Sequence, residues 1–172
     1  MEIRGAAERD ADAIRSIYNA EVLTSLATLD VAPRSEAEHL AWMSAHAGVY
    51  PVLVGVGGTG SSVGVGGGGG EVVGFSALSP YRPRSGYSTA VENSVYVAAA
   101  HRGKGLGRSL LEAIVEAAVT HGFHSIVARI STEQLASISL HKATGFEMVG
   151  VEREIGRKFG RWVDVAILQR ML

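Results

Sequence analysis

Residues 94–111 read SVYVAAAHRGKGLGRSLL, and within them a strand pattern passes through a glycine-rich turn into a helical pattern. The apolar side chains after the turn recur at helical spacing and predict an amphipathic helix that ends near His121. The apolar face of this helix consists of Leu106, Leu110, Leu111, Ile114, Val115 and Ala118. A helix that begins in such a turn presents free N–H groups and the positive end of its dipole, and both favour phosphate binding.

The turn itself has further features of a phosphate site. Its three glycines allow the backbone to approach a ligand closely. Arg102, Lys104 and Arg108 supply three positive charges, and no acidic residue occurs from 98 to 111. Successive N–H groups of residues 103–108 would surround a pyrophosphate. The alternative is a turn that glycine merely eases, with a solvated basic rim.

A second glycine-rich stretch, GVGGTGSSVGVGGGGG at 55–70, contains a G-x-G-x-x-G match but lacks the context of a dinucleotide site. It is followed by a strand pattern, EVVGFSAL, where a dinucleotide site needs a helix, and it has no Lys or Arg. Its Gly/Ser composition is typical of a flexible linker. We therefore predict that 57–70 is a flexible hairpin loop that tolerates shortening. This reading disfavours a nucleotide-dependent dehydrogenase.

Hydrophobic periodicity in the whole chain predicts the element order β-α-α-β-β-β-α-β-α-β-β. The expected strands are 2–5, 50–56, 71–78, 89–97, 124–131, 146–154 and 162–172, and the expected helices are 10–25, 35–46, 106–121 and 134–144. Asp10 is expected to cap the first helix, and Ser35 with Glu38 to form a capping box for the second. This order indicates an α/β fold in which helices cover one mixed sheet, with one domain over 1–172.

The composition narrows the classes of function. The 172 residues suffice for one domain with its own core. The formal net charge of −1 gives no reason to expect nucleic acid or an anionic membrane as a partner. The chain has no cysteine, which excludes disulfides and thiolate chemistry, and its six histidines lack the spacing of a metal site. No signal peptide or membrane-spanning stretch is visible, so we expect a cytoplasmic protein.

The pattern strand–R-G-x-G-x-G–helix at 94–111 resembles the acetyl-CoA pyrophosphate signature of the GCN5-related N-acetyltransferase (GNAT) superfamily. TEQLASISLHKATGFEMVG (132–150) is similar to the second cofactor segment of that superfamily. PYRPRSGYSTAVENSVYV (80–97) and GRKFGRWVDVAILQRML (156–172) further resemble phosphinothricin and methionine sulfoximine acetyltransferases. The resemblance covers nearly the whole chain except 57–70. It implies a single GNAT domain with a mixed, mostly antiparallel sheet, and acetyl-CoA as cosubstrate.

The resemblance also implies which residues hold acetyl-CoA. Backbone groups of the strand before the turn would contact the pantetheine arm and the thioester carbonyl, and the turn would hold the pyrophosphate. Gln134 stands where the family often has an asparagine that contacts the cofactor arm. The implied cofactor-binding residues are Val95, Tyr96, Val97, Arg102, Gly103, Lys104, Gly105, Leu106, Gly107, Arg108 and Gln134.

Acetyl transfer to an amine needs a base, because an ammonium group must lose a proton before it attacks. In TAVENSVYV, the alternation of a strand places Glu92, Ser94 and Tyr96 on one face and the valines on the other. A carboxylate within an apolar strand is costly unless it has a partner or a function. We therefore predict that Glu92 is the base, acting directly or through a water molecule. The alternative is a carboxylate that an arginine pairs at a sheet edge.

The departing thiolate benefits from a proton donor. His141 lies in SISLHKATGF, where many members of the superfamily have a tyrosine with this role, and histidine titrates near neutral pH. His141 would either donate the proton or only line the cofactor tunnel. Tyr96, on the same strand face as Glu92, is the second candidate.

The acceptor site is expected beside this base. Arg82 and Arg84 straddle a proline on a stiff loop, match the substrate-binding loop of the family, and would bind a carboxylate with paired hydrogen bonds. The alternative is an exposed basic loop. The expected substrate-binding residues are Leu29, Arg82, Arg84, Glu92, Asn93 and Ser94.

These residues together predict an N-acetyltransferase that acts on the α-amine of a small amino acid or analogue. An enzyme for peptide N-termini and a non-catalytic acyl-CoA sensor are the alternatives, although a sensor needs no base. In GRKFGRWVDV, alternation predicts a twisted strand in which Phe159, Arg161, Val163 and Val165 share one face. Relatives are usually homodimers with this region near the partner, so we expect a homodimer.

Overall fold

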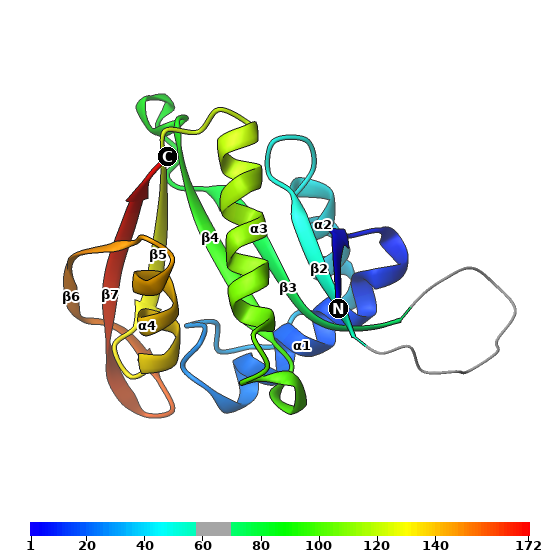
Figure 1. The fold of residues 1–172 in the computed structure, drawn as a ribbon. Coiled ribbons are helices and arrows are strands. Elements are labelled where there is room, and N and C mark those ends of the chain that lie inside the picture. Colours follow the sequence, from blue (N-terminus) through cyan, green and yellow to red (C-terminus); the bar gives the residue numbers. More distant parts are fainter. Residues whose placement is uncertain (58–69) are drawn as a thin grey trace, which may run out of the picture.

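The computed structural model describes residues 1–57 and 70–172, and a seven-stranded sheet forms its centre (Figure 1). The strands lie in the order β1-β2-β3-β4-β5-β7-β6. They are β1 (Glu2–Gly5), β2 (Val52–Gly57), β3 (Glu71–Pro80), β4 (Ala90–Val97), β5 (Ser125–Ser131), β6 (Glu147–Lys158) and β7 (Arg161–Met171). Neighbouring strands are antiparallel except β4 and β5. This confirms the mixed, mostly antiparallel sheet and the predicted element order.

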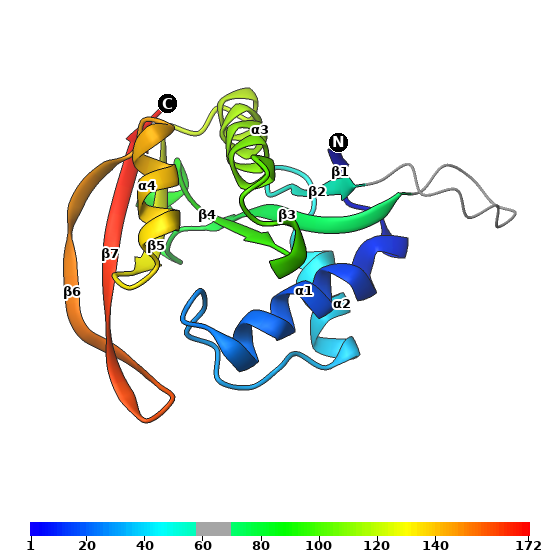
Figure 2. The same cartoon turned by 60° about the horizontal axis from the view of Figure 1, so that its bottom comes forward.

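Helices cover both faces of the sheet. They are α1 (Ala11–Thr24), α2 (Glu36–Ala45), α3 (Leu106–Thr120) and α4 (Leu135–Ala143), with short 3-10 turns η1 (Glu8–Asp10), η2 (Ser85–Tyr87) and η3 (Ala99–His101). Figure 2 shows α3 and α4 on one face and α1 and α2 on the other. No helix in the described ranges is long and apolar enough to cross a membrane.

The apolar face predicted for α3 forms one side of the core, since all six of its residues are buried. Leu111 and Ile114 pack against Val91 of β4 and Ile126 of β5. On the opposite face of the sheet, Tyr18 and other apolar residues of α1 pack against β2 and β3. The two layers of helices thereby hold β3 and β4 between them.

The capping box predicted for α2 is confirmed, because the N–H of Glu38 donates to Ser35 Oγ at 3.3 Å and the N–H of Ser35 donates to Glu38 Oε2 at 2.8 Å. Asp10 occupies the N-cap position predicted for α1, but its side chain caps no N–H group of the helix. The Asp10 carboxylate accepts from the Arg4 guanidinium and from the N–H of Ala7, so neither of its oxygens caps α1.

The predicted strand through GRKFGRWVDV is also corrected, because the chain turns within it. Phe159 (φ 51°) and Gly160 (φ 75°) form a two-residue turn, and Lys158 pairs with Arg161 across the β6–β7 hairpin. Two successive positive φ values are typical of the hairpin turn whose twist matches the flanking strands. Phe159 therefore lies at the hairpin tip and does not share a strand face with Arg161.

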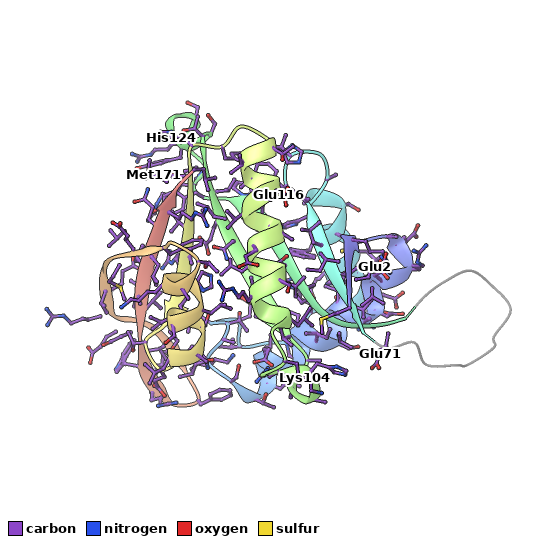
Figure 3. All side chains as sticks on the ribbon, in the orientation of Figure 1. Glu2, Glu71, Lys104, Glu116, His124 and Met171 are labelled. Carbon is purple, nitrogen blue, oxygen red and sulfur yellow. The ribbon has the colours of Figure 1, made fainter. Side chains whose placement is uncertain are left out.

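The predicted loop 57–70 falls on residues that are mostly outside the described ranges. Its two ends are described, and Gly57 of β2 pairs with Glu71 of β3. Glu71 is labelled in Figure 3 beside the undescribed segment, and Lys104 is labelled near the N-terminal end of α3. The flexibility of the loop and its tolerance of shortening remain predictions.

Candidate active site

A cleft opens where β4 and β5 separate. Three residue pairs join the two strands, from Ala90 with Ser125 to Glu92 with Val127, and the strands diverge beyond them. The cleft has a volume of about 560 Å³ and is lined by residues 92–97 of β4 and 128–131 of β5. Because each strand still pairs with its other neighbour, half of the backbone groups along the cleft face away from any strand partner.

The glycine-rich turn borders this cleft at Arg102, Gly103 and Gly107. Gly103 (φ 72°) and Gly105 (φ 85°) adopt the left-handed conformation, which a side chain disfavours. Within the described chain, the N–H groups from Gly103 to Gly107 have no hydrogen-bond acceptor. Five free donors before and in the first turn of α3 fit an anionic group such as a pyrophosphate.

The three cations of the turn bind neighbouring groups of the protein. The Arg102 guanidinium pairs with buried Glu21 of α1 and also donates to the carbonyl of Val97. Lys104 Nζ donates to the carbonyl of Ala100 at 2.9 Å, and Arg108 Nε donates to a Glu112 oxygen at 2.8 Å. Lys104 and Arg108 each use one of their N–H donors in these bonds, so both side chains and the free backbone N–H groups can donate to an anion here.

The other residues predicted to hold the cofactor divide into two groups. Val95, Tyr96, Val97 and Gln134 line the cleft. The side chain of Leu106 is buried in the core against β3, so only its backbone is available to a ligand.

Glu92 lies at the point where β4 and β5 part. It is half-buried, lines the cleft, and forms no ion pair with any residue that the structure describes. Burial raises the pKa of Glu92, while the charges of Arg129 and Arg82 lower it and the charge of Glu152 raises it. An unpaired carboxylate with a raised pKa in a cleft has the properties of a general base.

His141 and Asn93 form a hydrogen-bonded pair beside the cleft. His141 Nδ1 lies 2.8 Å from the carbonyl of Ser137, which only accepts, so Nδ1 carries the proton. His141 Nε2 then accepts from Asn93 Nδ2 at 3.1 Å. Burial lowers the pKa of His141 and favours this neutral form, which has no free proton to donate.

Tyr96 extends from the same face of β4 as Glu92 and packs beneath the cleft. Its ring lies 5.1 Å from that of Phe75 and 5.3 Å from that of Tyr18. Burial raises the pKa of Tyr96 far above its usual range. The phenol is therefore protonated at all physiological pH values.

The predicted acceptor-binding residues do not all come together. Leu29, Asn93 and Ser94 line the cleft with Glu92, and Leu29 packs against the backbone of Gly156 in β6. Arg82 and Arg84 are exposed on the turn after β3 and do not line the cleft. Arg82 is nevertheless close enough to lower the pKa of Glu92.

Two cations that the sequence reasoning missed lie next to the acceptor side of the cleft. Arg129 lines the cleft from β5. Buried Lys158, at the end of β6, donates to the carbonyl of Thr28 at 2.8 Å and so fixes the segment that carries Leu29. The signal for Arg129 was a single charge within the apolar strand SIVARIS, the same signal that identified Glu92. Among the described residues, no group of three His, Asp or Glu is arranged to hold a metal ion.

Comparison with known proteins gives consistent results. Residues 64–167 match the family model described as "Acetyltransferase (GNAT) domain". The chain is 39% identical to an L-methionine sulfoximine/L-methionine sulfone acetyltransferase of Pseudomonas paraeruginosa, over 97% of this chain and 92% of that protein. It is 34% identical to a phosphinothricin N-acetyltransferase of Streptomyces coelicolor, over 100% of this chain and 96% of that protein.

A solved structure has the same architecture. A putative acetyltransferase from Salmonella typhimurium with its cofactor acetyl-CoA superimposes with a TM-score of 0.91 and 38% sequence identity, over 100% of this chain and 94% of that one.

Proposed function

The chain belongs to the GNAT acetyltransferase family, and we propose that it transfers the acetyl group of acetyl-CoA to the α-amine of a small amino acid or analogue. Methionine sulfone, methionine sulfoximine and phosphinothricin represent this class, since similar proteins are named for them. The observation that carries the proposal is the half-buried carboxylate of Glu92, which pairs with no cation in the described part of the chain, in a cleft that borders a turn whose N–H groups from Gly103 to Gly107 lack an acceptor there. We propose further that 1–172 form one acetyltransferase domain.

The proposed cofactor site uses the backbone more than side chains. Bound acetyl-CoA supplies the acetyl group as an activated thioester. The N–H groups of residues 103–107 would hold its pyrophosphate, and backbone groups of Val95, Tyr96 and Val97 along the open side of β4 would contact the pantetheine arm and the thioester carbonyl. Gln134, at the start of α4, lines the cleft and would contact the same arm.

In the proposed mechanism, Glu92 removes a proton from the acceptor ammonium, directly or through a water molecule. Its raised pKa supports this role, because a base works best when its pKa approaches the operating pH. Tyr96 is the proposed donor to the departing thiolate because it lines the cleft and its phenol carries a proton, although its raised pKa makes it a weak acid. His141 is better suited to orient Asn93, since its one proton is held by the carbonyl of Ser137.

A thiol-release assay with acetyl-CoA tests the proposal. The acceptors should be methionine sulfoximine, methionine sulfone, phosphinothricin and a panel of peptides with free N-termini. We expect turnover with at least one small amino acid and little with the peptides. Absence of turnover with every small amino acid would overturn the proposed function, and turnover with peptides alone would identify an enzyme for peptide N-termini.

The homodimer and the cytoplasmic location belong to the same proposal. β6 is an edge strand of the sheet, and large apolar side chains are exposed along its hairpin with β7. They are Met148, Val149, Val151, Ile155, Phe159 and Trp162. An exposed apolar edge of this kind is typical of an interaction surface. Light scattering after size exclusion should give twice the mass of the chain, and a monomer at micromolar concentration would contradict this.

A further inference from the structure

Arg102 and Arg129 are cations that line the cleft, and whereas Arg102 pairs with Glu21, the proposed mechanism gives Arg129 no role. Arg129 lies on β5, between Ala128 and Ile130, which are both buried, and it is the charged residue of that strand. Its side chain is 32% exposed and lines the cleft. A charge at this position needs a partner or a function.

The sheet register places Arg129 on the same face as Glu92. Glu92 pairs with Val127, and residues two apart along a strand share a face, so Arg129 lies on the face of Val127. Glu152 of β6 belongs to the same face. It pairs with Val165 of β7, and Val165 pairs in turn with Ser131 of β5, which lies two residues after Arg129 and therefore shares its face. This is the face that α1 covers, since Tyr96, four residues after Glu92, packs on Tyr18 of α1.

Arg129 keeps most of its hydrogen-bonding capacity. One of its terminal nitrogens donates to Glu152 Oε2 at 2.6 Å, whereas a guanidinium group carries five N–H donors. No second acceptor contacts it within the described chain. Its free donors are therefore available to an anionic oxygen in the cleft, and Glu152 holds the side chain in place from the other side.

Two cations thus approach Glu92 from the two strands that flank β4, and the charge of Glu152 acts on Arg82 as well as on Arg129. Arg82 follows β3, which pairs with β4 on one side, and Arg129 lies on β5, which pairs with β4 on the other. Both charges reach Glu92, since both lower its pKa. An amino acid whose amine points to Glu92 and whose carboxylate points to the Arg82 loop would direct its side chain toward Arg129.

We propose that Arg129 binds an anionic group on the side chain of the acceptor, so that the enzyme prefers amino acids with a negatively charged side chain over neutral ones of the same shape. This inference rests on the proposed function and names the acceptor class within it. Glu152 occupies Arg129 until such an acceptor binds and then shares it.

Phosphinothricin and methionine sulfone form a matched pair for the test. Both place a tetrahedral group with two oxygens and one methyl at the same position of the side chain, but the phosphinate is negatively charged and the sulfone is neutral. Their ratio of kcat/KM therefore reports charge and cancels any change in Glu92, in cofactor binding or in folding that affects both acceptors equally.

The Arg129→Met variant should lower kcat/KM for phosphinothricin at least about tenfold more than for methionine sulfone, the amount expected for one hydrogen bond to a charged group. Glu152→Gln should shift the ratio the other way, because it releases Arg129. Arg161→Met is the matched control, since Arg161 also pairs with a glutamate, Glu133, at 2.8 Å, but does not line the cleft. It should leave the ratio unchanged.

Equal losses for the two acceptors in Arg129→Met, or a larger loss for the sulfone, would overturn the inference. Calorimetric titration of both acceptors into the protein with coenzyme A provides a readout that does not depend on turnover. The same loss of preference should appear there in Arg129→Met, and a wild-type protein that binds both acceptors equally would also overturn the inference. Failure of the proposed function appears separately, as absence of turnover in the wild type.

Discussion

Replacing Gly105 by alanine is expected to weaken acetyl-CoA binding through the backbone alone. Gly105 has φ 85°, and a Cβ added there would meet no atom within 4 Å. The left-handed conformation costs a non-glycine residue about 1–2 kcal/mol. If the turn relaxes to avoid this cost, the conformation with aligned N–H groups is populated about 5- to 30-fold less, and the KM for acetyl-CoA rises by the same factor.

Gly122→Ala supplies a control at the other end of α3. Gly122 has φ 76° and equally open space around its missing Cβ, but it lies after the C-terminal end of the helix, far along the sequence from the turn. Both variants should lower Tm by about 2–8 °C, the effect of 1–2 kcal/mol in a domain of this size. Only Gly105→Ala should raise the KM for acetyl-CoA.

Steady-state kinetics with acetyl-CoA and with S-acetylpantetheine separate the pyrophosphate from the rest of the cofactor. The truncated thioester lacks the pyrophosphate, so its kcat/KM should not respond to Gly105→Ala. An equal KM for acetyl-CoA in the two alanine variants would refute the reasoning, because the strain would then have no connection with the binding of phosphate.

Three further predictions concern the acceptor side and the core. Glu92→Gln should lower kcat by about 10²- to 10⁴-fold at pH 8 with an unaltered Tm, and an unchanged kcat would remove Glu92 as the base. Because burial raises the pKa of Glu92, the kcat/KM of the wild type should decrease with falling pH, with a midpoint above the ordinary carboxylate pKa of about 4.3. Gly156→Ala places a Cβ 2.5 Å from Leu29 Cδ1, so it should change the KM for the acceptor and leave the KM for acetyl-CoA unchanged. Parallel changes in both KM values would contradict a local effect. Burial lowers the pKa of His39 and His141, so these groups bind protons more tightly in the unfolded chain than in the folded one. The free energy of unfolding should therefore be constant above about pH 6.5, the ordinary pKa of histidine, and decrease as the pH falls toward the lower pKa values of the folded state. Equal free energies of unfolding in urea titrations at pH 7.5 and 5.5 would contradict this.

Local patterns predicted the elements well, because the signals for α3 and β4 lie within a few residues of one another. The apolar face of α3 follows from helical spacing, and the position of Glu92 on β4 follows from alternation. The capping box of Ser35 and Glu38 was equally local. Each of these needs only the period of one element, and the sequence shows that period directly.

Contacts between distant segments could not be predicted in this way. Arg102 was expected at the pyrophosphate, but it pairs with Glu21, 81 residues earlier in the chain. Lys158 reaches the carbonyl of Thr28 only because the β6–β7 hairpin extends beside α1. Such pairs depend on tertiary packing, which has no period in the sequence.

The sequence reasoning also missed the hairpin turn at Phe159 and one cation of the cleft, Arg129. Alternation continued through Phe159 and concealed the hairpin turn, although a Phe-Gly step before a strand is a weak turn signal. Arg129 was overlooked because it lies in an apolar strand that otherwise resembles pure core. On both the cofactor side and the acceptor side, most but not all of the residues predicted from the sequence line the cleft.

The separation of β4 and β5 also affects the mechanics of the molecule. Three residue pairs connect two half-sheets, β1–β4 and β5–β7, whereas seven pairs join β3 to β4 and seven join β5 to β7. We expect the cleft-facing amides of residues 93–97 and 128–131 to exchange hydrogen for deuterium faster than the amides of β3 and β7, because local opening needs least free energy there. A ligand that spans the cleft would join the half-sheets and slow this exchange. The exchange rate of these amides would then report the fraction of protein with bound ligand.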